Sequence, residues 1–326
     1  MMKLIALPSA IGLLITLCLH TTPAQALEAR TWVSTAGNDA SDCSRATPCA
    51  SFLTAHNKTL PGGEINCVDA GMFSIDFPLN ITKSITIDCA GTLGGLMGNA
   101  IGEVITINTA NINVRLRNLT INGLGANFIG INFQNGNALF VENCTIFGFN
   151  GGVGHGISFK PANGFTSQLY VTDSVVEGNG LFSGSGGGII IQPSGSGSAR
   201  VVIDRTRVNS NIYGIFANGT GSTGTIAVQV KDSTVSGNAF NGISAFTSAG
   251  HSITSITVDH SSSLLNGANG ILAQGQGGFV FVKDSTVMSN VTGLRAVSGG
   301  AIFSYQNNAL TGNVTDGAPT NVVTLK

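Results

Sequence analysis

Residues 201–243 read VVIDRTRVNSNIYGIFANGTGSTGTIAVQVKDSTVSGNAFNGI and hold two copies of one pattern. Each copy begins with a short apolar strand, which charged residues follow. An apolar residue that we call the anchor comes next, then an Asn, and then a Gly-Ile pair. Similar pairs, the last of them Gly-Leu, begin at positions 130, 156, 188, 214, 242, 270 and 293, so the spacing varies between 23 and 32 residues. A repeat of this length predicts a solenoid, a propeller or an array.

Apolar and polar residues alternate inside each copy, which predicts strands with one buried face. Ile226, Val228 and Val230 are expected to point inward in one strand, and Ile157 and Phe159 in another. No segment after about residue 60 has a helical period, so units of alternating strand and helix are excluded. The copies must therefore wind as a coil of strands in which distant residues form vertical columns.

Aligning the copies gives columns of residues with one character. The last inward residue of the second strand is Leu116, Val141, Val171, Ile203, Val230, Val258, Val282 and Tyr305. The anchor five residues later is Ile121, Ile146, Val176, Val208, Val235, Ser263, Val287 and Leu310. Three residues further on stands an Asn, namely Asn179, Asn211, Asn238, Asn266, Asn290 and Asn313. Each stacked amide can bond the next, so we predict a structural Asn ladder rather than a row of ligands.

The charged residues also fall into columns, and their signs alternate. One column contains Asp204, Lys231, Asp259 and Lys283, and its neighbour contains Asp173, Arg205, Asp232, His260 and Asp284. Opposite charges on adjacent strands stabilise by roughly 0.2–1 kcal/mol per pair. We interpret these acids as residues that set the register of the coil rather than as catalysts.

The first residues indicate export. Lys3 precedes a mostly apolar run, and Ala24-Gln25-Ala26 is a cleavage site of small residues, so residues 1–26 are predicted to be a secretory signal peptide. An uncleaved anchor is the alternative, but the run is shorter than the roughly 20 residues that span a bilayer. The formal net charge of −1 does not provide the excess of positive charge that binds nucleic acid. We expect a secreted or periplasmic protein without a membrane span or a nucleic-acid partner.

Five Cys residues follow the predicted signal peptide. Cys67 and Cys89 end similar tripeptides one turn apart, and stacked strands about 4.8 Å apart would allow a disulfide between them. Cys43 and Cys49 would then close a short loop. Cys144 remains, in a column rich in Ser and Thr, and is predicted to be a buried free thiol whose role stays open.

The opening segment is similar to that of known proteins. Trp32-Val33-Ser34, Gly37-Asn38-Asp39, the stretch PCASF at 48–52 and the stretch GGEI at 62–65 resemble the start of chondroitinase-B-like polysaccharide lyases. With the columns, they resemble right-handed parallel β-helix proteins of the pectate lyase superfamily. The resemblance implies an all-β, single-stranded right-handed parallel β-helix (solenoid) of about ten turns over residues 63–326. It also implies an N-terminal cap over 27–62.

Within this cap, the resemblance implies a short helix over residues 50–58. Phe52 and Leu53 are expected to cover the open end of the core. A solenoid needs such a cap because its end coil otherwise exposes apolar surface and unpaired strand edges.

Catalytic signatures of that superfamily carry over poorly. Gly154-His155-Gly156 matches the Gly-His-Gly motif of polygalacturonases, but the pair of aspartates that accompanies it there is missing, and hydrolysis needs two carboxyl groups. We therefore interpret His155 as a variable turn residue. Pectate lyases resemble one another in an acidic calcium cluster, and no such cluster stands outside the alternating columns. We predict no metal site and no cofactor, and calcium remains an unsupported alternative.

The outward positions of the first strand combine aromatic and amide side chains, which suit the CH faces and hydroxyls of sugars. The glycan-binding candidates are Gln134, Lys160, Gln192, Phe216, Phe246 and Gln274. The alternatives are that another segment covers Ile190, Phe216 and Leu272, or that they are tolerated apolar residues of the surface. A lyase would need a base and a cation, for which Lys160, Arg200 and Arg205, and more weakly His155, are the candidates.

These observations predict an exported carbohydrate-associated protein that binds or acts on a polysaccharide. The substrate and the oligomeric state stay open, as does the question whether the protein is an enzyme, a lyase or a glycoside hydrolase. The alternative is a non-enzymatic surface, adhesion or structural β-helix protein.

Overall fold

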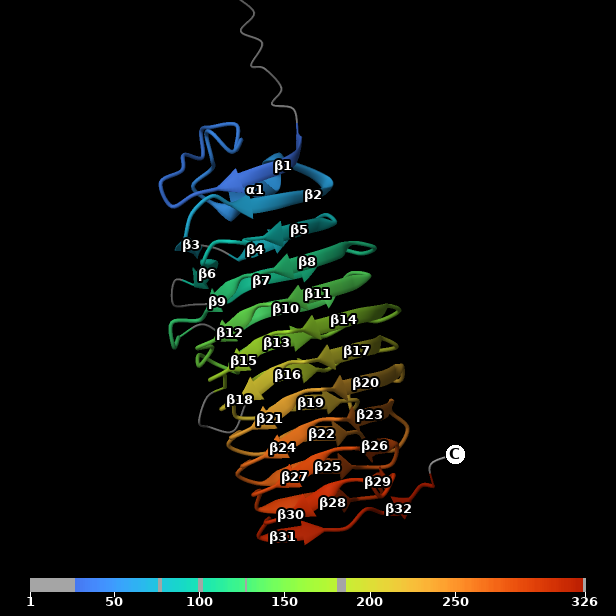
Figure 1. Cartoon of the computed structure of the whole chain (residues 1–326). Coiled ribbons are helices and arrows are strands. Elements are labelled where there is room, and N and C mark those ends of the chain that lie inside the picture. Colours follow the sequence, from blue (N-terminus) through green and yellow to red (C-terminus); the bar gives the residue numbers. More distant parts are fainter. Residues whose placement is uncertain (1–26, 76–77, 99–101, 127, 181–185, 325–326) are drawn as a thin grey trace, which may run out of the picture.

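A computed structural model describes residues 27–75, 78–98, 102–126, 128–180 and 186–324. The chain forms a right-handed parallel β-helix of about ten turns, as the repeat and the resemblance predicted (Figure 1). The predicted signal peptide, residues 1–26, lies outside the described residues. No helix within the described part is long and apolar enough to cross a bilayer.

Three parallel sheets make up the walls of the coil. Sheet A consists of β1 (Glu28–Val33), β2 (Thr59–Cys67), β5 (Ile85–Asp88), β8 (Asn113–Arg117), β11 (Ala138–Glu142), β14 (Thr166–Thr172), β17 (Ser198–Asp204), β20 (Thr225–Lys231), β23 (Ile253–Asp259), β26 (Gly278–Lys283), β29 (Ala301–Ser304) and β32 (Asn321–Val322). Sheet B consists of β3 (Gly71–Ile75), β6 (Gly94–Gly98), β9 (Thr120–Asn122), β12 (Thr145–Phe147), β15 (Val175–Glu177), β18 (Arg207–Asn209), β21 (Thr234–Ser236), β24 (Ser262–Leu264), β27 (Thr286–Met288) and β30 (Ala309–Thr311). Sheet C consists of β4 (Leu79–Ile81), β7 (Glu103–Asn108), β10 (Ile129–Asn135), β13 (His155–Phe159), β16 (Gly187–Ile191), β19 (Ile215–Asn218), β22 (Ile243–Phe246), β25 (Asn269–Gln274), β28 (Thr292–Val297) and β31 (Thr315–Gly317).

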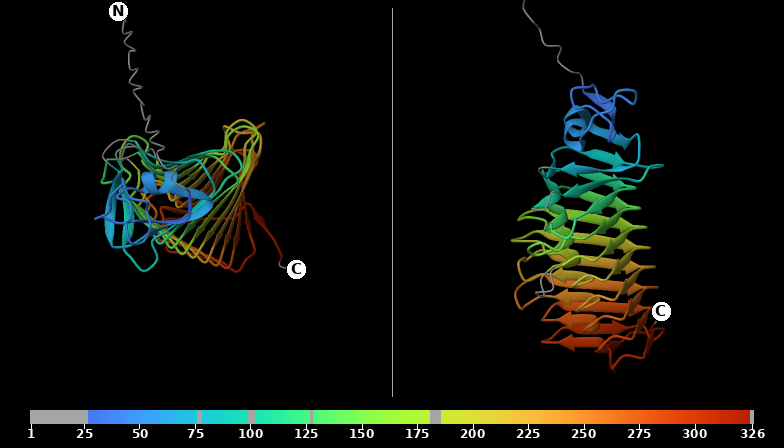
Figure 2. Two further views of the ribbon diagram at one scale, coloured as in Figure 1. Left: turned by 90° about the horizontal axis from the view of Figure 1, so that it is seen from above. Right: turned by 90° about the vertical axis from the view of Figure 1, so that its left-hand side faces the viewer.

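Each turn passes from sheet C to sheet A, then to sheet B, and returns to sheet C one level along the axis (Figure 2). The predicted columns are therefore real: Val230 pairs with Ile203 on one side and Val258 on the other. All three side chains are almost fully buried and form part of one continuous apolar core.

The glycine of each Gly-Ile pair is required by the close approach of neighbouring turns. A Cβ added to Gly214 would lie 2.5 Å from the carbonyl oxygen of Gly242, and one added to Gly242 would lie 2.8 Å from that of Gly270. Any side chain here would push the turns apart, so the repeat retains glycine.

The Asn ladder is present as predicted. Asn238 Nδ2 donates to Asn266 Oδ1 (2.9 Å), and Asn211 Nδ2 donates to Asn238 Oδ1 (3.2 Å). The same bond continues to Asn179 at one end and Asn313 at the other. Each amide also satisfies backbone groups of the turn, so the ladder ties adjacent coils together.

The charged columns lie in the predicted register, with Asp204 opposite Lys231 and Lys231 opposite Asp259. The ion pairs follow this register only in part. Lys283 Nζ lies 3.7 Å from Asp259, one strand away, whereas Lys231 pairs with its chain neighbour Asp232.

The second charged column has a further role that its sequence did not reveal. Its residues all have φ between 45° and 53° and form the bend from sheet A to sheet B: Asn118, Asn143, Asp173, Arg205, Asp232, His260 and Asp284. Asn and Asp tolerate this left-handed conformation better than most residues, which accounts for their frequency here.

The last turn departs from the predicted register by one residue. Ser304 pairs with Val282, so Tyr305 is not the inward residue, although Leu310 still pairs with Val287. One additional residue lies in the bend before β30, which a fixed spacing of five could not detect.

The N-terminal cap contains α1 (Phe52–Lys58), whose N-cap hydroxyl, Ser51 Oγ, accepts from Thr54 N (3.1 Å). Phe52 is fully buried as predicted, but Leu53 is 45% exposed, so the expectation that it covers the core is wrong. A helix buries only one face, and here Ala55 and His56 share that face with Phe52.

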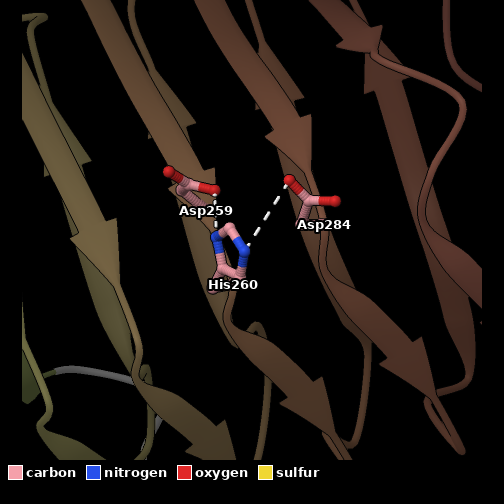
Figure 3. Close-up of side chains that lie close together, drawn as sticks. All are labelled: Asp259, His260 and Asp284. Carbon is pink, nitrogen blue, oxygen red and sulfur yellow. Dashed lines mark hydrogen bonds and ion pairs between the residues drawn. The ribbon is translucent and has the colours of Figure 1, made fainter.

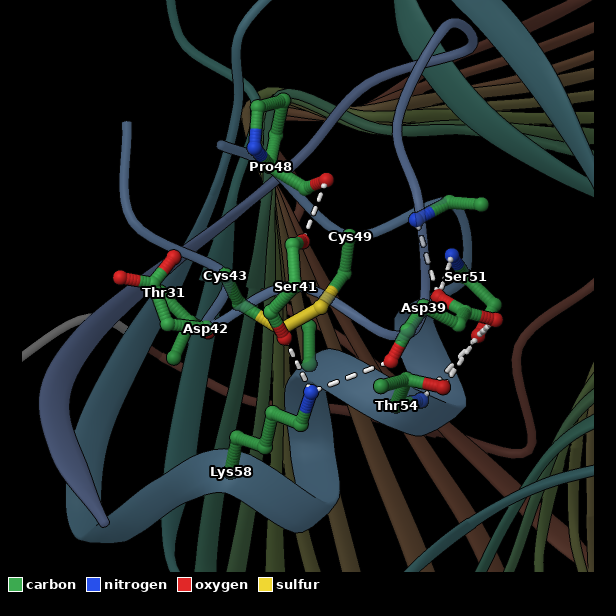
Figure 4. The surroundings of a disulfide bond; sticks show 12 residues. Thr31, Asp39, Ser41, Asp42, Cys43, Pro48, Cys49, Ser51, Thr54 and Lys58 are labelled. Carbon is green, nitrogen blue, oxygen red and sulfur yellow. Dashed lines mark hydrogen bonds between the residues drawn. A yellow bond between two sulfur atoms is a disulfide. The ribbon is translucent and has the colours of Figure 1, made fainter. Parts of the chain in front are cut away.

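The predicted disulfides Cys43–Cys49 and Cys67–Cys89 are both present. Figure 4 shows the first of them beside Asp39, whose side chain accepts from Ser51 Oγ (2.8 Å), and Lys58. Cys144 is free and buried, and its burial raises the pKa of the thiol to about 12. The division at residue 62 stays a prediction, since β2 crosses it and belongs to sheet A.

Candidate functional site

The outward face of sheet C brings the glycan-binding candidates together. Ser158 pairs with Asn132 on one side and Ile190 on the other, and that column continues through Phe216 and Ser244. A second column contains Asn218, Phe246 and Gln274. The glycan-binding candidates are all partly buried and lie within sheet C strands or one residue after them: Gln134, Lys160, Gln192, Phe216, Phe246 and Gln274.

One end of this face is polar, and we call Glu103, Asn132, His155, Ser158 and Lys160 the polar cluster. Asn132 Nδ2 donates to Glu103 Oε1 (2.6 Å). Within the described residues, His155 Nδ1 and Ser158 Oγ are buried without a hydrogen-bond partner. A buried polar atom left unpaired costs free energy, so these two atoms are the least satisfied groups of the polar cluster.

His155 differs from the variable turn residue that its sequence suggested. It begins β13 and is only 6% exposed, and its backbone N donates to Phe128 O (2.7 Å). Burial, with a smaller contribution from the Lys160 cation, lowers the pKa of the imidazole to about 4. The earlier interpretation is therefore wrong, because the strand starts one residue before the Gly-Ile pair here.

Lys160 is the cation of the polar cluster. Burial lowers the pKa of its ammonium group, and the negative charge of Glu103 partly offsets this effect. A lower pKa leaves a larger share of the amine neutral at a given pH than in a surface lysine, and only the neutral amine can act as a base.

The middle of the face is aromatic, and we call Tyr213, Phe216, Phe240 and Phe246 the aromatic row. The ring of Tyr213 stacks 5.4 Å from Phe216 and 5.3 Å from Phe240, and Phe216 lies 6.1 Å from Phe246. Phe240 is 39% exposed, and the other three rings are partly buried. The flat rings are surfaces on which the CH faces of a sugar can stack.

The end of this face opposite the polar cluster contains a hollow. Phe246 and Gln274 line a depression of about 520 Å³ together with the turns at Thr247–Ala249 and Gly275–Gln276. Of the three apolar residues in the outward column, Ile190 and Leu272 are buried, whereas Phe216 stays partly exposed.

The arginine candidates lie elsewhere. Arg200 is exposed on β17 of sheet A. Arg205 is in the bend beyond β17, where its guanidinium pairs with Asp173 (2.7 Å) and contacts Asp204. Neither arginine shares a sheet with Lys160 or His155, so the four candidates do not form one site.

One group of potential metal ligands lies in the charged columns. His260 Nδ1 lies 2.7 Å from Asp259 and Nε2 3.8 Å from Asp284 (Figure 3). Lys283 Nζ also contacts both carboxylates, at 3.7 and 3.3 Å. The lysine cation supplies the positive charge that a metal ion would, so we interpret the group as part of the ladder.

Sequence reasoning missed three members of this face: Glu103, Tyr213 and Phe240. Tyr213 stands directly before a Gly-Ile pair, in the column of His155, and that position could have been recognised as outward. Phe240 lies in a turn of variable length, and no periodic signal marks it.

Comparisons with known proteins place the fold. No protein-family model matches the chain, and no curated protein matches it in sequence. Among solved structures, the chain is similar to the pectate lyase Pel9A with a TM-score of 0.60 and 14% identity, over 90% of this chain and 79% of that one. It is similar to a rhamnogalacturonan lyase with a TM-score of 0.50 and 13% identity, over 84% of this chain and 75% of that one. At these identities the likeness shows the fold.

Proposed function

We propose that this protein is exported and binds a polysaccharide along the outward face of sheet C. The observation that carries the proposal is the aromatic row on that face, where Phe240 is exposed, the other three rings are partly buried, and Phe246 pairs in register with the partly buried amide residue Gln274. Strands about 4.8 Å apart repeat such groups in a line, so a long chain can make many weak contacts at once.

The chemistry of the face favours sugar over other ligands. Amide side chains donate and accept hydrogen bonds as hydroxyl groups require, and aromatic rings stack on CH faces. Two solved structures with this fold are named as polysaccharide-cleaving lyases, which is consistent with the proposal.

If the protein also cleaves its ligand, we assign Lys160 as the proton acceptor. In a β-elimination the base takes the proton beside a uronate carboxylate, the C–H electrons form a double bond, and the glycosidic oxygen leaves. Glu103 is the one carboxyl group among the outward residues of sheet C named above. Hydrolysis needs two carboxyl groups and is therefore not favoured.

A glycan array with residues 27–326 tests binding. Phe216→Ala and Phe246→Ala are expected to weaken binding about tenfold or more, whereas Phe147→Ala, an aromatic on sheet B, leaves it unchanged. If no polysaccharide binds at millimolar concentration, or the three variants behave alike, the proposal is wrong.

An absorbance assay separates the lyase from an adhesion or structural protein. A lyase releases an unsaturated product that absorbs in the ultraviolet, and Lys160→Met abolishes it without abolishing binding. An adhesion protein binds the same polymer and releases nothing.

Export rests on the predicted signal peptide and is supported by the two disulfides, which persist in oxidising compartments. Sequencing the N-terminus of the protein from the producing cell is expected to find Leu27 first. Retention of Met1 contradicts the predicted cleavage.

A further inference from the structure

The outward face of sheet A carries a column with a group of aromatic rings towards each end. In register along the axis, the column contains Arg115, Phe140, Tyr170, Val202, Gln229, Thr257, Phe281 and Phe303. The rings belong to its two ends, and three smaller or polar side chains separate them.

The first end is a closed stack. The guanidinium of Arg115 lies 4.2 Å above the ring of Phe140, and that ring is nearly parallel to Tyr170 at 4.9 Å and 5°. The next residue of the column is Val202, so Tyr170 ends the stack. Tyr170 Oη also donates to Gln168 Oε1 (2.7 Å), which fixes the orientation of the ring.

The second end mirrors the first. Phe281 stacks on Phe303 at 4.8 Å with an angle of 13°, and its other column neighbour is Thr257. Tyr170 and Phe281 therefore end two stacks on opposite sides of a gap. Four strand spacings separate them, or about 19 Å.

The gap is a hollow of about 490 Å³. Its outward lining is Arg200, Val202, Ala227, Gln229, Ser255 and Thr257. Arg200 is the one charged residue of this lining, and among the described residues no carboxylate lies within ion-pairing distance of it. The hollow thus combines an unpaired cation with amide and hydroxyl groups, and the next residues of the column on either side of it are Tyr170 and Phe281.

We propose that this hollow is a second glycan site, which binds a short acidic oligosaccharide of about three rings along the coil axis. Its uronate carboxylate pairs with Arg200, its hydroxyls bond Gln229 and Thr257, and its ends lie against Tyr170 and Phe281. The unpaired positive charge selects an anion, and a planar guanidinium matches a carboxylate in two hydrogen bonds. An apolar protein partner fits less well, because polar side chains occupy the floor between the rings.

The proposal is independent of the function assigned to sheet C, because the two sites share no residue. It also gives Arg200 a role that the lyase hypothesis could not, since Arg200 lies on another sheet than Lys160.

Isothermal titration calorimetry with trigalacturonate as the acidic probe and maltotriose as the neutral one tests the site. The background is the double variant Lys160→Met/Phe216→Ala, which removes contacts on sheet C. Trigalacturonate is expected to bind at least tenfold more tightly than maltotriose. Arg200→Gln and Tyr170→Ala are each expected to weaken its binding about tenfold, with the Arg200 effect shrinking at high salt.

Arg207→Gln is the matched control, since Arg207 is an exposed arginine on β18 of sheet B, outside the hollow. Loss of binding with Arg200→Gln but not with Arg207→Gln supports the site. Equal affinity for both probes, equal effects of both arginine changes, or no binding in this background overturns it. If polysaccharide binding to sheet C fails while this site holds, only the function proposed above is lost.

Discussion

The burial of His155 makes the stability of the protein depend on pH. The folded pKa of about 4 is below the ordinary imidazole value of about 6.5, so the unfolded chain binds more protons between these values. Stability is complete above about pH 6.5 and falls as the pH drops towards 4. The full shift corresponds to about 3 kcal/mol, of which about 2 kcal/mol is lost by pH 5.

His155→Gln removes this titration while keeping a polar side chain of similar length. Urea unfolding at pH 7 and at pH 5 gives the free energy of unfolding of each protein, and carboxylates contribute equally to both. The wild type is expected to lose about 2 kcal/mol more than the variant between the two pH values. His251→Gln, at an exposed turn residue, is the matched control and keeps the wild-type difference. An equal pH dependence in His155→Gln and wild type refutes the burial of His155.

Three further changes test the coil itself. Asn238→Ala leaves the partners of a buried ladder amide unpaired and is expected to lower the free energy of unfolding in urea by about 3 kcal/mol. Asn313→Ala, at the exposed end of the ladder, is expected to lower it by below about 1 kcal/mol. Equal losses in the two variants contradict the ladder. Gly242→Ala places a Cβ 2.5 Å from Ser263 Oγ and 2.8 Å from the backbone of the next turn. The variant is therefore expected to melt several degrees below the wild type. An unchanged melting temperature shows that the turns pack less closely than these distances indicate. Cys144→Ser places a hydroxyl in a column of Ser and Thr and is expected to change the free energy of unfolding by below about 1 kcal/mol. The native thiol is expected not to react with a disulfide reagent at pH 8. Rapid labelling of the thiol contradicts its burial.

The sequence predicted those features that repeat. The anchor column, the Asn ladder and the outward position of Phe216 each recur in several copies, and stacking turns forces recurring residues into rows. The positions that it missed occur once or depend on the local path of a bend. Leu53 faces solvent because of the exact rotation of a short helix, and Tyr305 is displaced by one additional residue in the last turn.

The two sites that we propose lie where a column is interrupted. Along the charged columns, each acid has a cation beside it, and Asp173 is held by Arg205 on the next turn. On sheet C, His155 stands between Ile129 and Gly187, neither of which can bond its imidazole, and Ser158 lies beside Ile190. On sheet A, the rings stop at Tyr170 and resume at Phe281. A regular column satisfies its own members, so a ligand can gain most at the turns where a column changes residue type. The polar cluster and the sheet A hollow are two such places.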